Sequence, residues 1–147
     1  MTADRDPAAE DLRALHQLAV AWVRREMPAS GPAEAMPAAA FRISDIGTVA
    51  EEVGGPGERG ADPLYATLFV VAAEGRLRAA AVVTGITIRD ERTGVEHPAA
   101  AVDLEHRDAD PVTIYLRLDR GGDEPRVVQT IPCDGRAMVF PARGGEA

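Results

Sequence analysis

The densest group of potentially reactive side chains lies between residues 90 and 110. This stretch, DERTGVEHPAAAVDLEHRDAD, contains seven carboxylates and two of the chain's three histidines. Carboxylates and imidazoles are common general acids and bases, and the same groups bind divalent metals. The chemistry open to them depends on which of these side chains share one face of a folded element.

A β-hairpin is predicted to organise this stretch. Arg92-Thr93-Gly94 fits a three-residue loop with glycine in the left-handed position. If Glu91 pairs with Val95, then Thr84 lies opposite Val102, and successive side chains along each strand point to opposite faces. The face of each reactive side chain then follows from its position along the strand.

The two histidines of the hairpin are expected on different faces. His97 shares a face with Asp103 and Glu105. It is six residues from Asp103 along the strand, which at about 3.3 Å per residue separates the two by about 20 Å. His106 has the parity of the buried face. We therefore expect no shared histidine–carboxylate site, and we predict neither a metal nor a cofactor.

The remaining candidates for chemistry are isolated polar groups. Asp103 and Glu105 lie about 7 Å apart on one face, close enough to share a cation or to act as an acid–base pair, with Tyr115 on the next strand. Two alternatives are an exposed sheet face carrying an Asp103–Arg117 ion pair and a surface for a partner. His16, beside the apolar stripe of the first helix, is either a half-buried residue at the core edge or a general base in a cavity.

Composition and charge exclude several functional classes. The formal net charge is −8, and all 16 basic residues are arginine. A chain without lysine cannot form a Schiff base through lysine or build a P-loop, and an acidic chain is repelled by nucleic acids and anionic membranes. A single cysteine excludes an internal disulfide. Without a signal peptide or a long apolar run, the protein is expected in the cytoplasm.

The apolar pattern predicts one domain spanning residues 1–147. Its first half contains an amphipathic helix at 8–26 anchored by Trp22, a linker at 28–40, a short helix at 44–53 and a flexible loop at 54–63. An antiparallel meander of about six strands follows at 64–140, beginning with a strand at 64–73 and ending with a short one at 136–140, and a loose tail is expected at 141–147. The expected class is α+β, with the N-terminal helix packed on a curved antiparallel sheet. This layout is similar in shape to cystatin-like and NTF2-like domains, although no motif connects the chain to either.

The leading functional hypothesis is a non-enzymatic cytoplasmic binding protein, an accessory, adaptor or chaperone-like subunit that binds another protein or forms a homodimer. The pattern predicts apolar residues on the second face of the sheet, and either the short second helix or a second protein must cover such a patch. The expected residues of that face are Leu68, Val70, Val83 and Arg117.

Two alternatives remain open. One is a small-molecule binder or a small enzyme of the isomerase, cyclase or dehydratase type, with a cavity between the first helix and the sheet. The residues expected in that cavity, besides His16, are Trp22, Tyr65, Thr84 and His106. The other is an acidic immunity or antitoxin-type protein that binds a basic partner.

Overall fold

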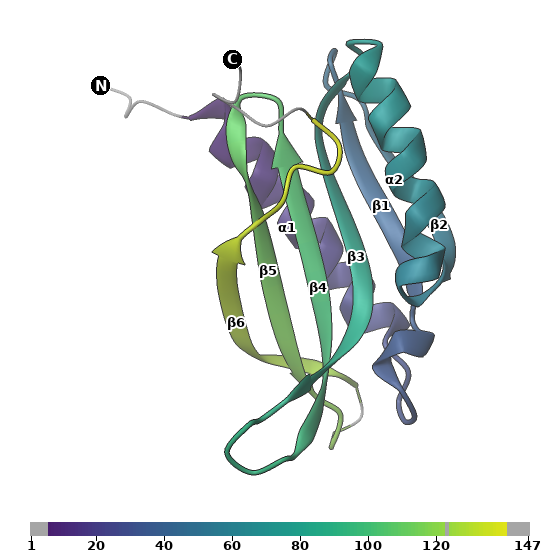
Figure 1. The fold of residues 1–147 in the computed structure, drawn as a ribbon, viewed down its shortest axis with the longest axis vertical. Helices are drawn as coiled ribbons and strands as arrows, with labels where there is room; N and C mark the ends of the chain where they lie inside the picture. The colour runs from purple at the N-terminus through teal and green to yellow at the C-terminus, as the bar shows by residue number, and fades with distance from the viewer. Residues whose placement is uncertain (1–5, 123, 141–147) are drawn as a thin grey trace.

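The computed structural model describes residues 6–122 and 124–140 (Figure 1). These residues form α1 (Pro7–Glu26), a 3₁₀ helix (Ala33–Ala35), β1 (Pro37–Ser44), β2 (Val49–Pro56), α2 (Gly57–Ala73), β3 (Leu77–Arg89), β4 (Glu96–His106), β5 (Ala109–Asp119) and β6 (Arg126–Asp134). The strands make one antiparallel sheet in the order β2-β1-β3-β4-β5-β6. The predicted α+β class, with the N-terminal helix packed on the sheet, is confirmed. The predicted tail, residues 141–147, lies outside the described residues.

The first helix forms as its sequence pattern indicates. Asp6 caps its N-terminus by accepting a hydrogen bond from the amide of Ala8 at 3.0 Å, and Pro7 occupies the first turn. Arg24 and Arg25 lie in the last turn, where they complement the helix dipole. The apolar stripe that faces the sheet consists of the buried residues Leu15, Ala19, Trp22 and Val23.

The region between residues 28 and 56 differs from the prediction. The expected linker at 28–40 contains the 3₁₀ helix and the first residues of β1, and the expected short helix at 44–53 is a turn followed by β2. Alanine has low β propensity, so the run at 38–40 resembles a linker in sequence. In the fold these alanines are at most 3% exposed, because both helices pack closely on this part of the sheet.

A second helix replaces two further predicted segments. The expected loop at 54–63 and the expected strand at 64–73 together contribute most of α2. A short continuous apolar run fits a strand or a helix, and here the buried residues Ala61, Leu64 and Leu68 recur at the spacing of a helix. Gly60 lets the first turn of α2 approach β2, since a Cβ there would lie 1.9 Å from the carbonyl oxygen of Gly55.

The hairpin register also differs from the prediction. Asp90 donates its amide to the carbonyl of Val95 at 2.8 Å, so the loop is one residue longer than expected. The last strand pair is therefore Arg89 with Glu96, and Thr84 lies opposite Ala101 rather than Val102. This one-residue shift moves the even-numbered residues of β3 onto the face that carries Asp103 and the odd-numbered ones onto the opposite face.

The two helices cover opposite faces of the sheet (Figure 1). The α1 face contains a core of residues from β1, β3, β4 and β5, whereas α2 packs over β1, β2 and β3. The end of the chain, predicted as a strand at 136–140, is irregular and packs on the α2 face through Val139. In the described part of the chain, no helix is long and apolar enough to cross a membrane.

Candidate functional site

A groove lies on the α2 face of the sheet, where α2 leaves the middle strands uncovered. Its volume is about 530 Å³ and it is open to solvent. One wall is α2, the floor is β3, β4 and β5, and the other wall is the segment that follows β6. The lining residues are Glu58, Ala61, Asp62, Tyr65, Thr84, Ile86, Ala101, Asp103, Thr113, Tyr115, Asp134, Arg136 and Met138.

A hydrogen-bond network connects the helical wall to the floor. The hydroxyl of Tyr65 donates to Oδ2 of Asp103 at 2.5 Å, and the hydroxyl of Thr113 donates to Oδ1 at 2.7 Å. Tyr65 comes from α2, while Asp103 and Thr113 are paired across β4 and β5. The carboxylate is thus held by one bond on each oxygen, which fixes its orientation in the groove.

The phenol of Tyr65 acts as a donor in this network. Burial raises the pKa of Tyr65 above its ordinary value, and the charge and hydrogen bond of Asp103 raise it further. The phenol therefore keeps its proton at physiological pH, and that proton is directed at Asp103.

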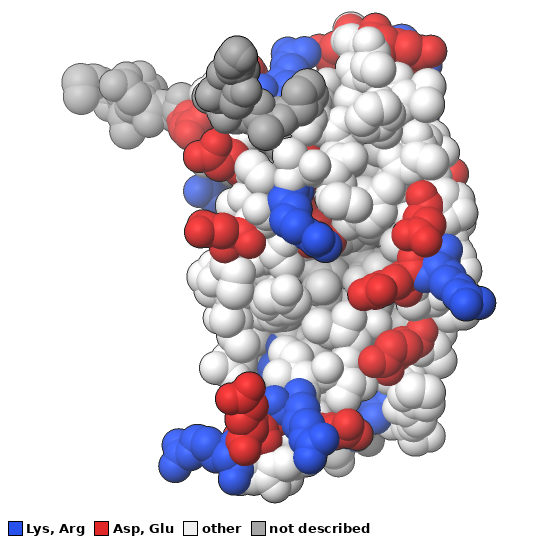
Figure 2. Space-filling view, in the orientation of Figure 1, with Lys and Arg blue, Asp and Glu red and all other residues white. Residues whose placement is uncertain are grey.

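The groove lining is predominantly acidic. Glu58, Asp62 and Tyr65 follow one another at helical spacing along the same side of α2. Asp134 adds a carboxylate and Arg136 a guanidinium from the opposite wall. Figure 2 shows this face of the molecule, with acidic side chains gathered over the lower half of α2.

Glu105 holds the second wall in place. Its carboxylate accepts hydrogen bonds from the backbone amides of Met138, Val139 and Phe140 at 3.0–3.2 Å. Glu105 is only 4% exposed, and Val139 is 2% exposed beneath the same contact. Glu105 and Asp103 share a face, as predicted, but Glu105 anchors the chain and Asp103 lines the groove.

The ionisation of Glu105 should make stability depend on pH. Burial raises the pKa of Glu105 above 4.5, although its three amide donors oppose the shift. Because the unfolded chain loses this proton first, the contribution of Glu105 to the free energy of unfolding falls as pH rises above 4.5 and is constant above the folded-state pKa. In urea titrations between pH 4 and 8, the stability of the wild type relative to Glu105→Gln should therefore decrease with pH. An increase over that range would contradict the direction of the shift.

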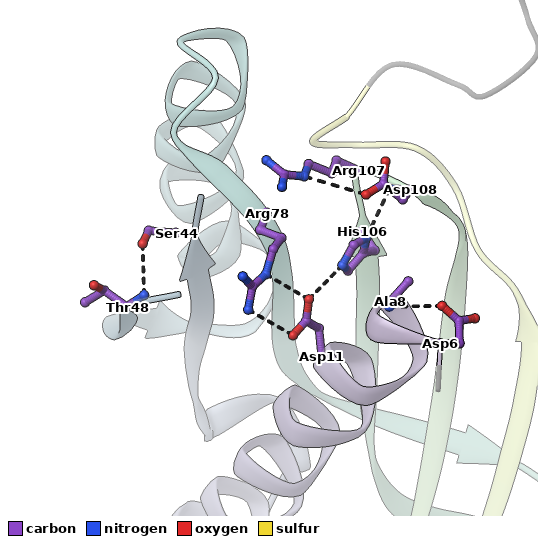
Figure 3. Close-up of polar contacts among 9 residues, drawn as sticks. All are labelled: Asp6, Ala8, Asp11, Ser44, Thr48, Arg78, His106, Arg107 and Asp108. Carbon is purple, nitrogen blue, oxygen red and sulfur yellow. Dashed lines mark hydrogen bonds and ion pairs between the residues drawn. The ribbon is translucent and has the colours of Figure 1, made fainter. Parts of the chain in front are cut away.

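His106 takes part in a separate polar cluster on the α1 face (Figure 3). Asp11 of α1 accepts from Nε2 of His106 at 2.8 Å and pairs with Arg78 at 2.9 Å. Nδ1 of His106 accepts the backbone amide of Asp108 at 3.0 Å, so the neutral ring carries its proton on Nε2. Both ring nitrogens are engaged, and the cluster fastens the start of α1 to β3 and β4.

The predicted cavity between α1 and the sheet is a packed core. Trp22 and its neighbours fill the interface, and Trp22 is 5% exposed. His16 lies at the core edge, as one of the two interpretations expects. Burial lowers the pKa of His16, and its Nε2 has no hydrogen-bond partner among the described residues. Of the residues predicted for the cavity, Tyr65 and Thr84 both line the groove on the opposite face of the sheet.

The predicted apolar sheet face does not form. Leu68 is buried between α2 and the sheet, Val70 is 54% exposed on the outside of α2, and Val83 lies in the α1 core. Arg117 lies opposite Ala99 and donates to Gln129 at 3.0 Å rather than pairing with Asp103. Leu68 and Val70 leave the predicted face because the segment at 64–73 is helical, and Val83 leaves it because of the one-residue shift in the hairpin register.

Several groove residues escaped the sequence interpretation. Arg136 and Met138 were expected in a strand, and Glu58 and Asp62 in a flexible loop. The spacing of Glu58, Asp62 and Tyr65, at i, i+4 and i+7, is the signal that could have revealed a helical wall. Tyr115, predicted beside Asp103, does line the groove.

Comparison with known proteins adds no assignment. No family model, curated protein or solved structure matches this chain. Among residues 6–122 and 124–140, no group of three or more histidine, cysteine, aspartate or glutamate side chains is placed to hold a metal ion.

Proposed function

We propose that this chain is a binding protein that holds a small polar molecule, or one polar side chain of a protein partner, in the groove beside α2. The observation that carries the proposal is the Tyr65–Asp103–Thr113 network, which fixes a carboxylate within an open groove. Sites built for binding commonly place a few fixed polar groups in a preformed concave surface.

The size of the groove supports this role. A volume of about 530 Å³ lies within the range of small-molecule sites. Thr84, Thr113 and Tyr115 place hydroxyls on the floor, and Ile86 and Met138 add apolar surface. Such a mixed lining can orient a ligand that has both polar and apolar parts.

The arrangement favours binding over catalysis. Both oxygens of Asp103 already accept a hydrogen bond from a neighbouring hydroxyl, so the fold holds the carboxylate in one orientation. The three histidines lie outside the groove lining. The binding role retains the leading sequence hypothesis but moves the contact surface from an apolar sheet face to a polar groove.

Native mass spectrometry of protein isolated gently from its own host tests this role. We expect an added mass, a small molecule or a second protein, on the wild-type chain. Ala101→Phe, which fills the floor of the groove, should abolish that mass. Ala66→Phe, on the exposed side of α2, provides a matched control that should retain it.

A bare wild-type protomer, or an added mass that survives Ala101→Phe, would contradict a binding role for the groove. Thermal unfolding of each variant verifies that it folds. Thr113→Val, which keeps the shape of the side chain but removes one bond to Asp103, provides a second groove variant if Ala101→Phe is unstable. It should weaken retention of the added mass.

A further inference from the structure

We infer that the groove selects an organic cation, an amine or a guanidinium, with Asp103 as the residue that receives the charge. This inference rests on the proposed binding role and narrows its ligand. The evidence is the direction of the hydrogen bonds around Asp103, one hydroxyl without a partner on a mostly buried residue, and the balance of charge along the walls.

The hydroxyls that surround Asp103 present only acceptor sites to the groove. A hydroxyl has one hydrogen, and those of Tyr65 and Thr113 are both donated to Asp103. Their remaining lone pairs, together with those of the carboxylate, can accept hydrogen bonds but cannot donate them. A ligand that hydrogen-bonds the Asp103 carboxylate must therefore supply the donors, as an ammonium or guanidinium group does.

Thr84 provides an independent indication of a ligand. It is 7% exposed, it lines the groove, and no described residue hydrogen-bonds its hydroxyl. Polar groups on residues this buried usually have a partner, and the groove leaves this hydroxyl accessible to one. Thr84 pairs with Ala101 across β3 and β4, and Asp103 is the next residue on the same face of β4. A ligand bound at Asp103 therefore lies close to Thr84.

The charge of the walls favours a cation. The groove lining contains four carboxylates, from Glu58, Asp62, Asp103 and Asp134, against the single guanidinium of Arg136. Within the groove, Asp103 is half-buried, whereas the other charged residues are exposed. The least solvated charge therefore is negative, and electrostatic attraction strengthens as solvent is excluded.

Binding of matched probes tests the sign of the ligand charge. In NMR titrations, benzylamine should perturb the amides of Thr84 and Asp103 and bind at least tenfold more tightly than benzyl alcohol or benzoate. Asp103→Asn should weaken benzylamine binding by about tenfold or more, since it removes a charged hydrogen-bond acceptor. Glu51→Gln, an exposed change of equal charge on β2, should leave it unchanged.

A second pair of probes distinguishes a free cation from a basic side chain. Acetyl-Gly-Arg-Gly-amide carries the guanidinium on a peptide, and the same peptide with citrulline is its neutral counterpart. Preference for the arginine peptide over benzylamine would assign the groove to a partner's side chain, and the reverse would assign it to a small molecule. Either preference supports a cation site.

Equal or tighter binding of the neutral or anionic probes would overturn the inference, as would the failure of every cation to bind. Neither result overturns the proposed function, which depends on the added mass and its loss in Ala101→Phe. If Asp103→Asn does not fold, Asp62→Asn on the exposed side of the groove replaces it. That variant should weaken benzylamine binding two- to threefold, and no change would count against a cation.

Discussion

Replacing Glu105 with alanine is expected to destabilise the protein by about 3 kcal/mol and to release the wall of the groove formed by residues 136–140. Hydrogen bonds to a charged group contribute about 1.5–3 kcal/mol each, and removing a buried acceptor leaves its donors unpaired. Three consecutive amides depend on this one carboxylate. The loss is smaller than their sum because the released amides can bind water.

Urea unfolding and hydrogen exchange together check this expectation. In Glu105→Ala, the amides of Met138, Val139 and Phe140 should exchange much faster than in the wild type. Glu105→Gln keeps one acceptor oxygen and should lie between the two. Glu51→Ala, on the exposed surface of β2, should change stability by less than about 0.5 kcal/mol.

Unchanged protection of these amides in Glu105→Ala would show that side-chain packing, rather than the carboxylate, holds the segment. The groove offers a further readout. Since Arg136 and Met138 form its second wall, Glu105→Ala should also weaken the binding of a groove ligand. The affinity that remains in Glu105→Ala then measures how much the wall formed by residues 136–140 contributes to ligand binding.

The helix α1 and the strand β5 were predictable because their apolar residues recur with a clear period, and β3, β4 and β6 because turn signals bound their apolar runs. In β5 every second residue is apolar, and in α1 the apolar residues form one stripe. In each element these residues make up the side that packs on the core. The number of strands was also predicted, but two of the six were placed wrongly. The expected strands at 64–73 and 136–140 are a helix and an irregular segment, whereas β1 and β2 were expected as a linker and a short helix.

These errors have a common physical origin. Where a segment is buried on both sides, as β1 is, alternation disappears, and alanine gives no propensity signal for a strand. The same loss of periodicity made Leu64–Ala73 ambiguous. Tertiary packing, in which the two helices cover opposite faces, makes β1 a strand and is not visible along the sequence, whereas the helical spacing of Ala61, Leu64 and Leu68 was the available signal for α2.

The groove could be predicted only in part for the same reason. Asp103 and Tyr115 were expected on one face, and they do share one. The observed pairing of β5 with β4 differs from the predicted pairing by an even number of residues, which leaves each side chain of β5 on its predicted face. Thr84 was placed on the opposite face, because a one-residue error in the hairpin loop reverses every side chain of β3. Tyr65 required the helix α2 to be recognised first.

Replacing Trp22 with alanine is expected to cost about 3–5 kcal/mol, the largest single-residue effect among these predictions. Trp22 is 5% exposed in the α1 core, and its ring meets Phe41 edge-on with centroids 6.2 Å apart. Its indole N–H donates to the carbonyl of Pro37 at 3.0 Å. The side chain thus fastens α1 to the start of β1 by packing and by a hydrogen bond.

Urea titrations of Trp22→Ala, Trp22→Phe and Leu18→Ala separate these contributions. Trp22→Phe keeps an aromatic ring against Phe41 but leaves the carbonyl of Pro37 without its donor, so a loss of about 1–2 kcal/mol is expected. Leu18 is on the same helix but 37% exposed, and its truncation should cost less than about 1 kcal/mol. If Trp22→Ala were no more destabilising than Leu18→Ala, α1 would be held mainly by the Asp11–His106–Arg78 cluster. Loss of that cluster, rather than of the indole, would then detach the helix from the sheet.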